Sequence, residues 1–134
     1  MRRVVALLCV TALAACAGDE GSIDELCTAV RADRSTWEVF SGFDPTNTER
    51  ALEQLRAARV TLGGLRDVAP DEVRDDLDVE IGYVQALIDG LDKLEVADPA
   101  QAVEVVRQVT EDHPKVADAA GGLTSFSEEH CGAS

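Results

Sequence analysis

The chain has two histidines, His113 and His130, and their spacing limits the chemistry that they could support. They belong to no HExxH or HxxxH pattern, so they do not form the local pair that binds zinc from one helix face. Ser125 and Ser127 lie close to His130, but they lack the GxSxG turn of a nucleophilic serine. The sequence therefore indicates no catalytic residues, no metal and no cofactor.

Acidic side chains are concentrated between residues 71 and 80. They are Asp71, Glu72, Asp75, Asp76, Asp78 and Glu80. Such a cluster could collect a cation, but it lacks the DxDxDG loop and distal glutamate of an EF-hand. The acids interleave with Val73, Leu77 and Ile81 at helical spacing. We interpret them mainly as the solvated face of an amphipathic helix.

Three charged residues interrupt apolar stripes and are candidates for a small ligand-binding gap. Asp33 and Arg34 fall where the stripe between Val30 and Trp37 should continue, and Arg59 lies beside the stripe of the next segment. A charge on a buried face needs a partner of opposite sign. The sequence thus predicts an Asp33–Arg59 pair. The alternative places Asp33 at the edge of its stripe in water.

The first sixteen residues combine a basic pair, Arg2 and Arg3, an apolar run and the sequence Leu13-Ala14-Ala15-Cys16. The run from 4 to 15 is too short to span a bilayer and has the length of a signal-peptide core. The pattern resembles the lipobox of bacterial lipoproteins. The resemblance implies that residues 1–15 are removed and that Cys16 becomes a lipid-bearing N-terminus on the outer side of the cell membrane. Residues 16–21 would then form a short tether.

Of the four cysteines, Cys9 leaves with the signal peptide and Cys16 takes the lipid, which leaves Cys27 and Cys131. Two cysteines in an oxidising compartment predict a disulfide. The alternative is a metal or redox site formed by both cysteines and His130. The chain contains no CxxC pair that would support this alternative.

The mature chain of 119 residues has 10 basic and 26 acidic side chains, a formal charge of −16. This length fits one small domain. The acidity argues against nucleic acid and against docking on anionic lipid, because both need clustered Lys and Arg.

Apolar spacing predicts four amphipathic helices and no strand. They start near Ser22, Thr46 or Thr48, Pro70 and Asp98, and His113-Pro114 should kink the last one, residues 99–130. A Cys27–Cys131 bond requires the chain to return to the start of the first helix. We therefore expect an all-α domain over residues 22–131, an up-down four-helix bundle with a kinked fourth helix.

These features together favour a membrane-anchored, extracytoplasmic lipoprotein that binds another envelope protein and is not an enzyme. A carrier of a small ligand or metal is the alternative, and an envelope hydrolase ranks after it.

Overall fold

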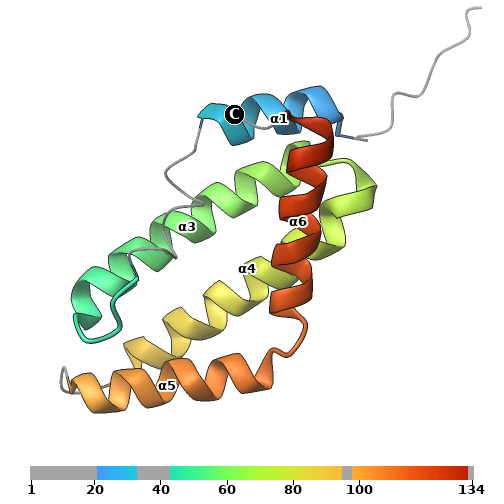
Figure 1. The fold of residues 1–134 in the computed structure, drawn as a ribbon. Coiled ribbons are helices and arrows are strands. Elements are labelled where there is room, and N and C mark those ends of the chain that lie inside the picture. Colours follow the sequence, from blue (N-terminus) through green and yellow to red (C-terminus); the bar gives the residue numbers. More distant parts are fainter. Residues whose placement is uncertain (1–20, 33–42, 95–97, 133–134) are drawn as a thin grey trace, which may run out of the picture.

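A computed structural model describes residues 21–32, 43–94 and 98–132, and these contain five helices and no strand. The helices are α1 (Ile23–Ala32), α3 (Thr48–Val68), α4 (Asp71–Asp92), α5 (Pro99–Asp112) and α6 (Val116–His130). Figure 1 shows α3 and α4 along the length of the molecule, with α5 at one end of the pair and α1 at the other. The predicted all-α class is confirmed.

Helices α3 and α4 form the most extensive helix–helix contact and act as the platform of the fold. Asn47 caps α3, because its side chain accepts a hydrogen bond from the Arg50 N–H at 3.2 Å. The helix thus starts where the sequence predicted, near Thr46 or Thr48, but its cap is Asn47 rather than either threonine. Ala69 and Pro70 connect α3 to α4, and a proline suits this place because a first helical turn needs no N–H from it.

The buried residues of α3 and α4 make up most of the hydrophobic core. They are Ala51, Leu55, Ala58, Leu62 and Leu65 from α3, and Val73, Leu77, Val84, Leu87, Ile88 and Leu91 from α4. Helix α6 adds Ala119, Leu123 and Phe126. Burial of large apolar side chains contributes about 1.5–3 kcal/mol each, which makes this seam the main source of stability.

The segment predicted as one kinked helix is divided into α5 and α6 at His113, Pro114 and Lys115. Pro114 has no N–H to continue the hydrogen-bond ladder, and the helix restarts when the Val116 N–H donates to the His113 carbonyl at 3.1 Å. Both helices pack on α4 rather than extensively on one another. The prediction of one kinked helix over residues 99–130 was therefore wrong, and the up-down four-helix arrangement is not confirmed.

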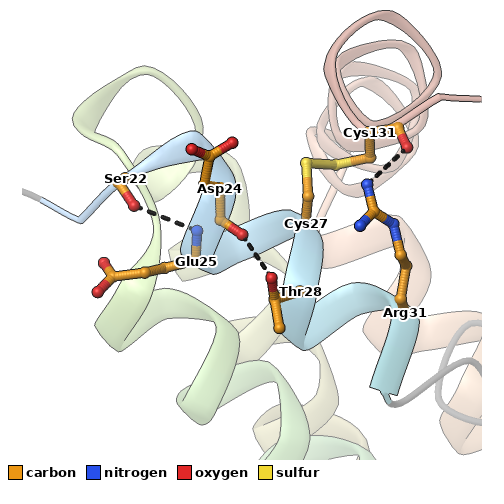
Figure 2. The surroundings of a disulfide bond; sticks show 7 residues. All are labelled: Ser22, Asp24, Glu25, Cys27, Thr28, Arg31 and Cys131. Atoms are coloured by element: carbon orange, nitrogen blue, oxygen red, sulfur yellow. Dashed lines mark hydrogen bonds between the residues drawn. A yellow bond between two sulfur atoms is a disulfide. The ribbon is translucent and has the colours of Figure 1, made fainter.

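The predicted disulfide joins Cys27 of α1 to Cys131 at the end of α6, with a Cα–Cα distance of 5.1 Å. Figure 2 shows this bond with Arg31 beside it, whose guanidinium donates to the Cys131 carbonyl at 3.2 Å. Ser22 caps α1 as predicted, because its hydroxyl accepts from the Glu25 N–H at 3.1 Å. The tip of α6 is thereby fixed to the first turns of α1.

Among the described residues, no helix is both long enough and apolar enough to cross a membrane.

Candidate functional site

The most unusual side chain of the described fold is Glu80, the one buried charged or polar residue among those described. Buried positions follow one another along α4 in alternating steps of four and three: Val73, Leu77, Glu80, Val84, Leu87 and Leu91. This spacing is typical of the buried face, or seam, of a packed helix, and it places Glu80 between apolar residues. Glu80 is therefore an exception to the interpretation of the acidic cluster as mainly a solvated face.

The environment of Glu80 disfavours its charged form. The side chain is 7 % exposed, and its Oε1 atom has no hydrogen-bond partner among the described residues. Burial raises the pKa of the Glu80 carboxyl to about 7, and the nearby carboxylate of Asp76 acts in the same direction. A neutral acid fits this position, whereas a carboxylate would be left without a compensating charge.

Asp76 lies one helical turn before Glu80 and packs against the backbone of α6. A Cβ atom added at Gly122 would collide with Asp76 Oδ2. The glycine thus lets the two helices approach closely at this carboxylate. Ala119, one turn earlier in α6, is also small and is 3 % exposed. Gly122 of α6 therefore lies against the acidic part of α4.

A second feature is an open cleft of about 370 Å³ at the corner between α5 and α6. It is lined by Asp78, Val79, Gly82, Asp112, His113, Pro114 and Lys115. Most of the lining surface is apolar, and ionisable side chains surround it. Such a combination, an apolar floor with a few polar groups, is typical of sites for small ligands or for a partner's side chain.

His113 is held rigidly at this cleft. Its Nδ1 atom is 2.8 Å from the Val109 carbonyl oxygen, and since a carbonyl can only accept, Nδ1 carries the proton. The Tyr83 ring contacts the imidazole edge-on at 5.9 Å between centroids, and the Tyr83 hydroxyl is hydrogen-bonded to Thr110. With Nδ1 bonded to Val109, Nε2 is the ring nitrogen that is left for another hydrogen bond.

On the rim of the cleft, Asp78 is already paired. Its carboxylate accepts two hydrogen bonds from the Arg66 guanidinium of α3, which hold the pKa of Asp78 below its usual value. Asp112 and Lys115 are exposed and leave one charge of each sign near His113. The cleft therefore provides an imidazole acceptor, an ammonium and a carboxylate around an apolar floor.

The predicted ligand gap at Asp33, Arg34 and Arg59 cannot be located as a whole. Arg59 is exposed on α3, while Asp33 and Arg34 lie outside the described residues. The Asp33–Arg59 pair stays a prediction. Cys16, with the predicted signal peptide and most of the tether, is likewise outside the described residues.

The alternative metal or redox site at Cys27, Cys131 and His130 was wrong, because the two sulfurs bond to each other. The imidazole of His130 packs on Phe126, with ring centroids 4.4 Å apart. In the part of the chain that the structure describes, no group of three or more His, Cys, Asp or Glu side chains could hold a metal ion.

Sequence reasoning missed both Glu80 and the cleft. The four-three spacing of the buried face admits Glu80, but it fits Ile81 almost equally well, so it did not single out Glu80. The cleft had no local signal, because its lining comes from two segments, residues 78–82 and 112–115, that are distant in the sequence.

The fold and site define a disulfide-linked, all-α protein with a buried acid and a corner cleft. The comparisons with protein-family models, curated proteins and solved structures found no match for this chain.

Proposed function

We propose that the mature chain is a lipid-anchored module on the outer side of the cell membrane, where it binds another envelope protein and catalyses no reaction. The anchor rests on the lipobox residues Leu13 to Cys16, which follow a basic pair and an apolar run. The Cys27–Cys131 disulfide supports this location, because such bonds persist in oxidising compartments.

The binding role rests on the cleft at the α5–α6 corner. Its lining combines the apolar Val79, Gly82 and Pro114 with His113 and Lys115. A protein partner could insert one apolar side chain there and donate a hydrogen bond to the imidazole. The strong negative charge of the chain favours a basic partner over nucleic acid or anionic lipid.

A carrier of a small ligand is the second candidate, and the volume of the cleft favours it. About 370 Å³ lies in the range of pockets that hold small organic molecules. Such a ligand would need an apolar body and a hydrogen-bond donor for the imidazole.

Site-specific photocrosslinking in the native host distinguishes these candidates. A photoreactive residue at Lys115 should capture a discrete envelope protein, whereas the same residue at Val60, which is 74 % exposed on α3, should not. Lys115 was chosen because it lines the cleft while its side chain is exposed. Capture should decrease sharply in Cys16→Ala, which cannot be lipidated.

Two results would contradict the interaction module. Equal labelling at Lys115 and Val60 would indicate random encounters. A bait that labels only itself, together with a small molecule retained in native mass spectrometry and lost in His113→Ala, would favour the carrier. Membrane fractionation and palmitate labelling of Cys16→Ala test the anchor separately.

A further inference from the structure

Glu80 lies on α4 between two places where α4 contacts the C-terminal part of the domain. One helical turn before it, Asp76 packs against Gly122 of α6. Just beyond it, Gly82 lines the corner cleft with residues 113–115. The first half of α6, which contains the buried Ala119, runs between these two points. We call Asp76, Glu80, Ala119 and Gly122 the α4–α6 latch.

The charges around the latch do not compensate an ionised Glu80. On α4, Asp76 is negative and raises the pKa of Glu80. On α6, the one charged residue between Val116 and Gly122 is Asp118, which is exposed.

The other elements packed against α4 also carry no basic group that is paired with Glu80. On α3, Arg56 binds Asp92, Arg66 binds Asp78 and Arg59 is exposed. At the corner, Lys115 is exposed and the His113 imidazole contacts Tyr83 and Val109. On α5, Arg107 binds Glu104 and Glu111, and Asp112 is exposed.

We propose that the α4–α6 latch is a pH-sensitive device: it is closed in acid, where Glu80 is neutral, and it loosens as the medium approaches neutral pH, because opening lets Glu80 ionise in water. A buried, unpartnered carboxylate is costly, whereas the same group in water is solvated. At a pH above the ordinary pKa of a glutamate, each opening event therefore releases one proton from Glu80.

The motion is confined by the covalent structure of the domain. The far end of α6 is fixed to α1 by the Cys27–Cys131 bond. The near end follows the break at His113–Lys115, where the chain can turn without breaking a continuous helix. Opening should therefore affect the first half of α6 and the adjoining corner, and should leave α3 in place.

Hydrogen exchange with mass spectrometry, from pH 4.5 to 8 and corrected for intrinsic exchange rates, tests the device on the full chain in non-ionic detergent. The opening constant of residues 116–123 should rise about tenfold for each pH unit between roughly pH 5 and 7 and flatten above, as one released proton requires. Residues 48–62 of α3 serve as the internal reference: they should open far less often than residues 116–123 at every pH, because they exchange only when the whole domain unfolds.

Variants assign the response to Glu80. Glu80→Gln should abolish the rise, since the amide does not ionise, and Glu72→Gln, an exposed acid of the same helix, should retain it. Asp76→Asn should move the flattening to lower pH, because the neighbouring negative charge is removed. If Glu80→Gln does not fold, Glu80→Leu, which is apolar and of similar size, replaces it.

Three outcomes would overturn the proposal. They are a wild-type profile without pH dependence, opening constants that coincide in α3 and in residues 116–123 at every pH, which would show global unfolding, and a rise that Glu80→Gln retains and His113→Asn removes.

Discussion

Removing the Cys27–Cys131 bond tests how the domain holds its first helix. In the described part of α1, only Leu26 and Cys27 are buried, so α1 contributes little to the core by itself. We expect the double variant Cys27→Ala/Cys131→Ala to be strongly destabilised, and α1 to lose protection before the other helices.

The magnitude follows from the loop that the bond closes. The two cysteines are 104 residues apart in the sequence. In the chain-entropy model, closing a loop of this length stabilises the fold by about 4.7 kcal/mol, because it restricts the unfolded chain. With a urea dependence of about 1.5–2 kcal/mol per molar, the midpoint of unfolding should fall by roughly 2–3 M.

Urea unfolding followed by circular dichroism measures this shift, and hydrogen exchange shows the order in which the helices open. Reduced wild-type protein should match the double variant. Thr28→Ala, which removes an exposed hydroxyl on the same helix, should change stability by less than about 0.5 kcal/mol. A loss below about 1 kcal/mol in the double variant would refute the reasoning that loop closure stabilises this domain.

Three further outcomes are expected. The wild-type free energy of unfolding should fall as pH rises from 4.5 to about 7 and should end about 3 kcal/mol lower. The reason is that folded Glu80 keeps a proton that the unfolded chain releases. Urea titrations of wild type and Glu80→Gln at a series of pH values measure this change. Gly90→Ala should cost about 1–3 kcal/mol, because the new Cβ would lie 2.6 Å from Val105 Cγ1. Gly64→Ala meets open space in α3 and should stabilise by up to about 1 kcal/mol, so thermal melts of this glycine pair should shift in opposite directions.

The pH response bears on the proposed location of the protein. A chain anchored outside the cell membrane is exposed to the pH of the medium rather than to a buffered cytosol. The corner that lines the cleft adjoins the first half of α6, so the shape of the cleft would change as the α4–α6 latch opens. Photocrosslinking at Lys115 in cells held at pH 5.5 and at pH 7.5 would show whether partner binding follows the same transition.

Local features of the sequence predicted much of the fold. Ser22 caps α1, Pro70 precedes α4, and Asp98 accepts hydrogen bonds at the start of α5, all near the predicted helix starts. These signals act over one or two turns, which is why they can be read without tertiary structure. The disulfide followed from counting once the lipobox resemblance assigned Cys9 to a signal peptide and Cys16 to a lipid, because Cys27 and Cys131 then remained to pair.

The burial of Glu80 was not available from such signals. The periodicity of α4 fits Ile81 and Glu80 almost equally well, because the two residues are only about 100° apart around the helix. The choice depends on which neighbours cover α4, and these are α3 on one side and α5 and α6 from the far end of the chain. Ile81 is half-buried, while Glu80 lies in the seam.

The sequence by itself determined the all-α class, the helix starts, the break at His113-Pro114 and the pairing of the two cysteines. The first three properties depend on hydrogen bonds, backbone geometry and spacing within a few residues, whereas the cysteine pairing followed from elimination. Only the tertiary structure decided that Glu80 is buried, that Gly122 approaches Asp76 and that α4 and the corner share a cleft. Burial and clefts are made by segments distant in sequence, so their position depends on how the whole chain packs.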